Sequence, residues 1–293
     1  MSEHRSLVYM MFLAMTLWGA GWVALKILTP HASFEVITFW RFAIMLVSFI
    51  PIILLMKPKL YIPRKSWKYI VVAAALNITF MVFSFFGIKF GTASGGAVII
   101  TTLTPLFTFL LMRVFAKKLM SSYQIMGVSL GFIGGVIMLE IGFVTFESFF
   151  DKGNLFYIFA SLVWAVITML SQKSHKYIHP VHYSFTISLI GTIIAFLGTL
   201  HVDLAIVFEQ DVAFWIALIF LGVFGQTVAT TIYYVASGRL GSSQASSFMF
   251  IVPLTALILA YFILGEALEL TILTGGLISL FAVYLINKKP FGV

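Results

Sequence analysis

The 293-residue sequence has no cysteine and few charged residues. The absence of cysteine excludes disulfide bonds, thiolate metal ligands and cysteine nucleophiles. Only 10% of the residues are charged and 61% are hydrophobic, whereas about 25% of the residues in an average soluble domain are charged. The apolar runs are close to continuous, so no sizeable soluble domain fits between them. The chain is therefore predicted to be an integral membrane protein that forms one helical bundle.

Apolar stretches of roughly 20 residues, the length at which a helix crosses a bilayer, recur along the whole sequence. They cover approximately residues 7–28, 34–56, 69–89, 94–114, 123–142, 154–172, 182–200, 213–236, 244–264 and 270–287. The first is too long for a signal-peptide core and has no convincing cleavage site, so we expect it to remain in the mature protein. The predicted fold class is an all-α polytopic membrane protein with ten transmembrane helices.

Basic and acidic residues are divided unequally between the loops. If the N-terminus is cytoplasmic, the inner segments contain 14 of the 18 Lys and Arg residues, and Glu3 is the only acid among them. The positive-inside rule then predicts that both termini are cytoplasmic. The net charge of +8 is therefore explained by the orientation in which the chain inserts into the membrane. No nucleic-acid partner is expected. Richness in lysine, isoleucine and phenylalanine favours a bacterial inner membrane.

Landmarks in the first half of the sequence recur in the second half about 146 to 148 residues later. The pairs are Trp18 with Trp164, Trp22 with Thr168, Lys26 with Gln172, Pro105 with Pro253 and Gly127 with Gly275. We predict two five-helix repeats, 1–146 and 147–293. The odd number of helices inverts the second repeat relative to the first, and inverted repeats are typical of transporters that alternate access around a central site.

Aromatic and polar side chains share one face of the first and sixth predicted helices. Positions 18, 22 and 26 are spaced four residues apart, and positions 164, 168 and 172 repeat this spacing. We interpret Trp18, Trp22, Trp164 and Thr168 as residues of a substrate cavity, because polar side chains avoid lipid. The alternative is that the tryptophans pack in the core and that Lys26 and Gln172 mark the membrane interface.

Other polar residues within the predicted helices are further candidates for substrate binding. Asn77, Gln226 and Tyr233 could line the cavity or form hydrogen bonds between helices. Arg41 is the only basic residue well inside a span and is the leading candidate for binding an anionic group such as a carboxylate. Alternatively, the Arg41 guanidinium snorkels to the interface or binds backbone carbonyls.

Two prolines lie within predicted spans at matching positions of the two halves. Pro105 and Pro253 should each bend or loosen their helix, and paired interruptions indicate a transport site with gating at the breaks. Static kinks are the alternative. Thr101, four residues before Pro105, could face the cavity or bond a freed carbonyl.

Small residues predict how two of the helices pack. Gly127, Gly131 and Gly135 form one face of the fifth helix, and Gly275 with Ser279 forms a weaker one on the tenth. Such faces allow close backbone approach. We expect these helices to pack within one chain, although a homodimer is possible.

The sequence resembles the ten-helix EamA-type branch of the drug/metabolite transporter superfamily. The resemblance spans essentially the whole chain and rests on Trp18-Gly19, Arg41-Phe42, Thr104-Pro105-Leu106, Gly127, Val252-Pro253-Leu254, Gly265-Glu266 and Gly275. It implies two inverted repeats, a cavity formed mainly by helices 1, 3, 4, 6, 8 and 9, and transport of amino acids, nucleotide-sugar-like metabolites or drugs. One departure is Lys117-Lys118, which stands where the second half has Gly265-Glu266.

The coupling mechanism is constrained by what the middle of the spans contains. No Asp, Glu or His lies there, which argues against proton-driven exchange. The first helix also lacks the glutamate on which the related small multidrug resistance proteins depend. We expect a facilitator or weakly coupled exporter of small metabolites, most of all amino acids or related zwitterionic or aromatic solutes, without a cofactor. The alternatives are a drug efflux permease and a flippase of a phosphorylated lipid-linked sugar.

An enzyme or a metal protein is the remaining class to consider. His175, His179 and His182 have helical spacing, but Pro180 interrupts any helix that would hold all three and no acid is nearby. We therefore expect an exposed loop there rather than a metal site, and no catalytic constellation elsewhere in the chain.

Overall fold

The computed structural model describes residues 2–56, 60–91, 93–117, 119–139, 152–265 and 270–288, and the regular elements in these ranges are all helices. The longer helices are α1 (Ser2–Leu28), α2 (Phe34–Leu55), α3 (Trp67–Phe90), α4 (Ala93–Phe115), α5 (Ser122–Met138), α7 (Lys152–Ser174), α8 (Pro180–Gly198) and α13 (Leu270–Asn287). Two further spans are composite. One joins α9 (Val212–Phe220), the π-helical η4 (Leu221–Thr230) and α10 (Thr231–Arg239); the other joins α11 (Ser242–Ser247), the 3₁₀-helical η5 (Phe248–Ile251) and α12 (Val252–Leu264).

Within the described ranges, nine helices are long and apolar enough to cross a membrane, and α5 is a shorter apolar helix. The predicted all-α polytopic fold is therefore confirmed, and the spans begin and end within a few residues of the predicted ranges. The last residues of the predicted fifth span, 140–142, lie outside the described residues. Two short 3₁₀ helices, η1 (Arg64–Ser66) and η3 (Leu204–Glu209), precede α3 and α9.

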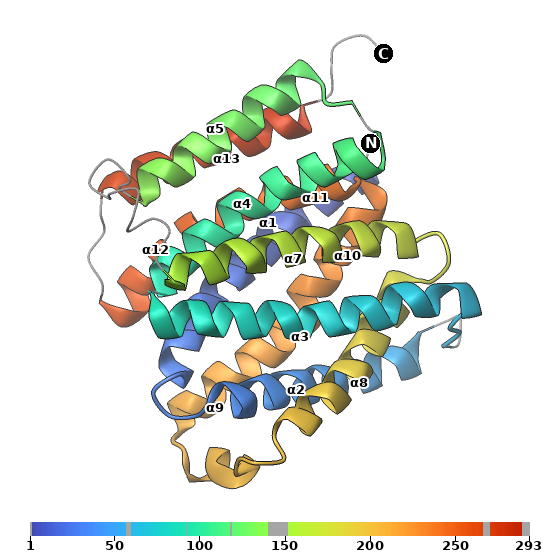
Figure 1. The fold of residues 1–293 in the computed structure, drawn as a ribbon, viewed down its shortest axis with the longest axis vertical. Coiled ribbons are helices and arrows are strands. Elements are labelled where there is room, and N and C mark those ends of the chain that lie inside the picture. Colours follow the sequence, from blue (N-terminus) through green and yellow to red (C-terminus); the bar gives the residue numbers. More distant parts are fainter. Residues whose placement is uncertain are drawn as a thin grey trace.

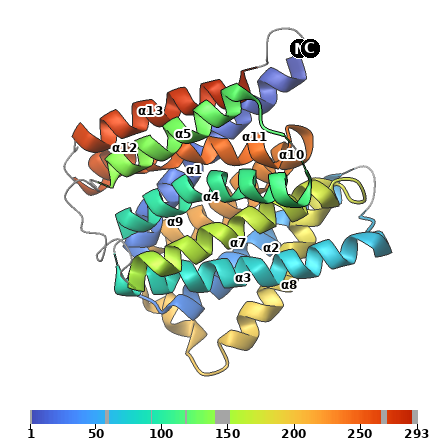
Figure 2. The ribbon, with the colours of Figure 1, turned by 45° about the horizontal axis from the view of Figure 1, so that its top comes forward.

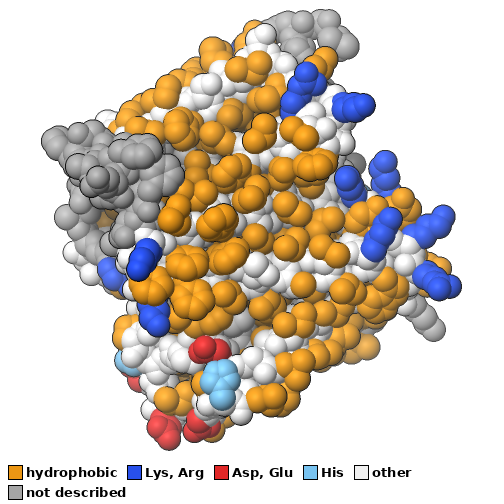
Figure 3. Space-filling model, in the orientation of Figure 1, with side chains coloured by type: hydrophobic (Ala, Val, Ile, Leu, Met, Phe, Trp, Pro, Cys, Tyr) orange, Lys and Arg blue, Asp and Glu red, His pale blue; other side chains and the backbone are white. Residues whose placement is uncertain are grey.

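The helices lie side by side in one bundle, with α1 passing through its interior and the α5–α13 pair along one edge (Figures 1 and 2). Figure 3 shows most of the visible Lys and Arg side chains at the end where α1 begins and α13 ends, and the acidic side chains, with a few basic ones, at the opposite end. We call these the basic end and the far end. This separation fits the charge pattern of the sequence; which end faces the cytoplasm stays a prediction.

The long sides of the bundle are covered by apolar side chains (Figure 3). Leu54 and Phe262, for example, are 78% and 75% exposed. A soluble protein rarely exposes so large an apolar surface, but lipid tails cover such a surface without cost. The outer surface therefore fits a bilayer, and the polar side chains are left to the interior and the two ends.

The predicted packing of α5 on α13 is confirmed. A Cβ atom added to Gly127 would lie 2.9 Å from the carbonyl oxygen of Ala282, and one added to Gly134 would lie 2.6 Å from that of Gly275. Side chains at these two positions would push the helices apart. The predicted glycine stripe is wrong for its other members, because Gly131 faces Phe250 and Gly135 faces Thr102.

Candidate functional site

A cavity of about 1030 Å³, its open mouth included, runs from the middle of the bundle to the far end. We call it the central cavity. Its inner limit is at Trp18, midway along α1, and its outer limit is near Thr29 and Phe34, where α1 gives way to α2. The predicted site residues that line it are Trp18, Trp22, Arg41, Thr101, Trp164 and Gln226.

The inner limit of the central cavity is an aromatic floor. The rings of Trp18 and Trp164 meet edge to face with centroids 5.4 Å apart, and the Trp18 centroid lies 5.0 Å from that of Tyr233. Phe80 packs on Trp164 at 4.7 Å. Helices α1 and α7 therefore face each other across the cavity as the repeated spacing predicts, with their tryptophans in contact at its base.

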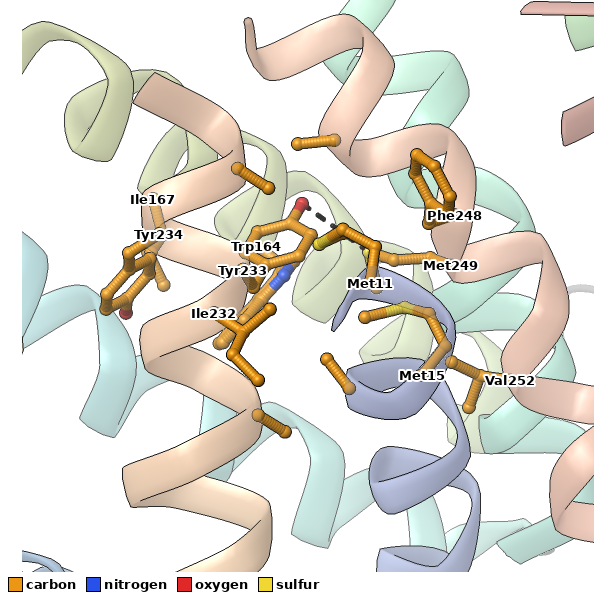
Figure 4. Close-up of a cluster of buried hydrophobic side chains, with 14 of the residues drawn as sticks. Met11, Met15, Trp164, Ile167, Ile232, Tyr233, Tyr234, Phe248, Met249 and Val252 are labelled. Atoms are coloured by element: carbon orange, nitrogen blue, oxygen red, sulfur yellow. Dashed lines mark hydrogen bonds between the residues drawn. The ribbon is translucent and has the colours of Figure 1, made fainter. Parts of the chain in front are cut away.

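Below this floor, toward the basic end, the bundle is solidly packed. Figure 4 shows Met11 and Met15 of α1 beside Trp164 and Tyr233, and the Tyr233 hydroxyl donates to Met249 Sδ at 3.7 Å. Met11 and Met15 are fully buried. Because these described side chains are buried against one another, they close the central cavity toward the basic end.

Two side-chain pairs hold α7 against the composite helices at the basic end. Ser237 Oγ of α10 donates to Ser171 Oγ at 2.8 Å. Gln172 Oε1 accepts from the backbone N–H of Ser242, the first residue of α11, at 3.1 Å, and also from the Ser242 hydroxyl. We call these two pairs the basic-end seal. Gln172 thus acts as a cap for the α11 N-terminus.

Three predicted site residues lie below the cavity rather than along it. Asn77 Nδ2 donates to the Tyr234 hydroxyl at 3.3 Å, which is the interhelical bond that was the alternative for this residue. The hydroxyls of Thr168 and Tyr233 are 2.8 Å apart. Spacing along a helix cannot separate these positions from the lining ones, because both face inward.

The wall opposite Trp18 is the π-helical η4, which sequence reasoning missed. A π-helix pairs each carbonyl with an N–H five residues on, and it is frequent at functional sites. Trp18 Nε1 donates to the Gly225 carbonyl at 3.2 Å, and Thr230 Oγ1 donates to the same oxygen at 3.1 Å. The only signal in the sequence is the glycine pair, Gly222 and Gly225.

Arg41 is the cation of the central cavity. Its Nε is buried and has no hydrogen-bond partner. The described residues that line the cavity include no Asp or Glu. Because the Nε–H donor is buried without a partner and no carboxylate of the described lining offsets the positive charge, this arrangement favours an anionic solute group at the guanidinium.

Two lining hydroxyls were also missed, although the sequence holds a signal for each. Thr38 lies three residues before Arg41 and so shares its helix face, and Ser84 lies seven residues after Asn77. Both hydroxyls add hydrogen-bonding capacity to a wall that is otherwise mainly apolar.

The two prolines have different surroundings. Helix α4 continues through Pro105, where Thr104 Oγ1 donates to the Ile100 carbonyl and Thr101 Oγ1 to the Ala97 carbonyl, both at 2.6 Å. Pro253 instead stands in the first turn of α12, directly after the 3₁₀-helical η5. Of the two predicted breaks, the described residues therefore show an interruption at Pro253 and none at Pro105.

The prediction of an exposed loop holds for only part of the histidine group His175, His179 and His182. His179 is exposed, His175 is half-buried, and His182 is buried within α8. The exposed loop is therefore wrong for His182, because α8 begins at Pro180, where a proline fits the first helical turn. Burial and the charge of Arg239 lower the pKa of His175 and of His179 from the usual histidine value, which favours the neutral form of both side chains.

Comparisons with known proteins agree over the length of the chain. The EamA-like transporter family profile matches residues 5–140 and 151–288. An uncharacterized transporter of Archaeoglobus fulgidus is 26% identical over 288 residues, 94% of this chain and 96% of that one. The uncharacterized transporter YoaV of Bacillus subtilis is 22% identical over 264 residues, 89% of this chain and 90% of that one. A protein of known crystal structure has the same fold, with a TM-score of 0.76, 18% identity and 97% of each chain covered.

Proposed function

Because the chain belongs to the EamA-like transporter family, we propose that it transports small solutes that carry a carboxylate, most of all amino acids and related zwitterionic or aromatic metabolites. Solute movement would occur by alternating access around the central cavity. The observation that carries the proposal is Arg41, whose Nε is buried without a hydrogen-bond partner in a cavity lined by three tryptophans.

The chemistry of the lining supports this class of solute. An arginine fork binds a carboxylate through two parallel hydrogen bonds. The ring faces of Trp18, Trp22 and Trp164 can attract an ammonium group or stack on an aromatic side chain. A lipophilic cation finds Arg41 and no carboxylate among the described lining residues, so a drug efflux permease for cations fits less well.

The proposed cycle uses the two halves of the chain as inverted copies, 1–146 and 147–293. With the basic end cytoplasmic in a bacterial inner membrane, the structure corresponds to a state that is open outward and closed inward. The described lining holds no Asp, Glu or His to carry a proton. We therefore propose a facilitator or weakly coupled exporter that works without a cofactor; a homodimer stays a prediction.

The test is solute flux in proteoliposomes, with labelled tryptophan compared with tryptamine, which lacks the carboxylate. Arg41→Gln should lower tryptophan flux by roughly 30-fold or more, the factor expected when one partner of a buried charge pair is removed. Arg113→Gln is the matched control, because Arg113 is exposed in the last turn of α4. Tryptamine should cross no faster than in empty liposomes.

The outcome decides between the candidate solutes. Equal flux of tryptophan and tryptamine, unchanged by Arg41→Gln, would contradict the carboxylate site. Movement of a phosphorylated lipid-linked sugar that depends on Arg41, without amino-acid flux, would favour the flippase instead. Thermal unfolding of each variant in detergent checks that the protein remains folded.

A further inference from the structure

A second cavity, of about 980 Å³ with its open mouth included, lies on the other side of α1. We call it the side cavity. Helices α1, α4, α12 and α13 form most of its wall, and its lining is apolar except for Lys26 and Thr29. It shares Trp22, Leu25, Thr29 and Ile88 with the central cavity, so these residues form a common wall.

The side cavity has the length of one bilayer leaflet. Along α12 it extends from Pro253 to Leu264, the last residue of the helix. Eleven helical steps correspond to roughly 16 Å, and half of a hydrocarbon core of about 30 Å is nearly the same depth. Beside it on α12, Tyr261 and Phe262 are exposed on the outer surface of the bundle. The cavity therefore lies at the depth of the leaflet on the far-end side.

Neither water nor empty space suits this cavity. A buried water needs two to four polar partners, which the lining does not provide. An unfilled apolar void forfeits the dispersion contacts of its walls. A hydrocarbon chain from the adjacent leaflet has the length and the polarity to fill it.

The side cavity has one positive charge among its described lining residues. Lys26 stands in the last turn of α1, at the far-end limit of the cavity. Lysines at a membrane surface attract anionic headgroups. The apolar length and the Lys26 ammonium thus match the two parts of one amphiphile.

We propose that the side cavity binds one acyl chain of an anionic phospholipid from the far-end leaflet, with the headgroup held at Lys26. The site is distinct from the solute site, but its occupant contacts Trp22, which also lines the central cavity. Lipid bound there supports the shape of the central cavity without being transported.

The test uses liposomes that contain phosphatidylglycerol or phosphatidylcholine with a photoreactive acyl chain, and mass spectrometry to map the labelled peptides. We expect phosphatidylglycerol to label α4 near Ala97 and α12 between Pro253 and Leu264. Ala256→Phe, which fills the cavity, should lower this labelling about tenfold. Ile258→Phe is the matched control, since Ile258 lies on the same helix outside the cavity lining.

A second variant tests whether Lys26 binds the lipid headgroup. Lys26→Gln should lower phosphatidylglycerol labelling about fivefold, toward the phosphatidylcholine level, as expected for the loss of one lysine at a lipid surface. Labelling spread evenly over the outer helices, or unchanged in folded Ala256→Phe, would overturn the proposal. Equal labelling by both lipids would overturn the headgroup assignment. Labelling needs no flux, so failure of the lipid site and failure of the proposed solute are separate results.

Discussion

Helices α1 and α7 carry Trp18 and Trp164, which are matching landmarks of the two predicted repeats, but their neighbours hold them differently. At the basic end, α7 is bonded to α10 and α11 by the basic-end seal. At the far end, the side cavity lies between α1 and its neighbours α4 and α12. Helix α7 is therefore bonded to its neighbours at one end of the bundle, whereas α1 borders a cavity at the other end.

The residues at the two positions explain part of this difference. Gln172 offers a carbonyl oxygen to the N-terminus of α11. Its counterpart Lys26 has donors only, and a positive charge is unfavourable beside a helix N-terminus. The far end therefore cannot close by the bond that closes the basic end. If the halves exchange arrangements during transport, as we propose, closure of the far end needs other contacts, and the two states of the cycle are unequal in energy.

The largest expected effect separates the two tryptophans of the cavity floor. Trp164 is 5% exposed, whereas Trp18 is half-buried because it borders the open side of the cavity. Trp164→Ala should lower the free energy of unfolding by about 3 kcal/mol or more, the range for large core truncations. Trp18→Ala should cost about half as much. Unfolding of both variants in detergent measures the difference.

Both floor variants should also lose tryptophan flux in proteoliposomes, because both rings border the solute site. Equal losses of stability would mean that the two halves pack alike around the floor, contrary to the burial difference. Phe262→Ala is the control, since Phe262 is exposed on the outer surface and should change neither quantity.

A smaller effect is expected when the basic-end seal is broken. Gln172→Leu removes two hydrogen bonds, each worth about 0.6 kcal/mol in membrane proteins, and should raise basic-end opening roughly sevenfold. The chain has no cysteine, so Met15→Cys gives a single reporter below the floor. Its reaction with a water-soluble maleimide, added from the basic end, measures the opening.

The seal experiment has a matched control at the other end of the molecule. Gln210, the residue directly after η3, donates from Nε2 to the carbonyl of Ile206, four residues earlier in the same short segment. Gln210→Leu should leave the reactivity of Met15→Cys unchanged. No increase with Gln172→Leu would show that packing alone, rather than these bonds, closes the basic end.

The sequence was sufficient to predict the spans and the meeting of Trp18 with Trp164, because apolar length and a repeated spacing determine both. It failed for Lys26 and Gln172, which were placed on the tryptophan faces. Eight residues along a helix amount to a rotation of roughly 80° from the starting direction. Lys26 therefore turns into the side cavity, and Gln172 turns toward α11.

The sequence also did not predict whether an inward-facing polar residue lies above or below the cavity floor. Asn77 and Gln226 both face the interior, but Asn77 bonds Tyr234 below the floor and Gln226 lines the cavity above it. Only the packing of neighbouring helices decides between these outcomes. The π-helical η4 depends on such packing as well, since the glycine pair Gly222 and Gly225 is not enough to distinguish its ten residues from an α-helix.

The smallest expected effect compares the prolines of the two halves. Pro105 lies inside a continuous α4, so Pro105→Ala restores an N–H that an α-helix directs to the carbonyl four residues back, and should stabilise the protein by about 1 kcal/mol. Pro253 is in the first turn of α12, where an N–H has no partner within the helix. Pro253→Ala should therefore change stability by less than about 0.5 kcal/mol. Unfolding in detergent compares the two variants. Equal shifts in stability would mean that the interruption before α12 does not reduce the stability cost of Pro253.

A loss of flux in Pro253→Ala at unchanged stability would assign the broken helix of the second half to gating, because only movement of that helix would then have been altered.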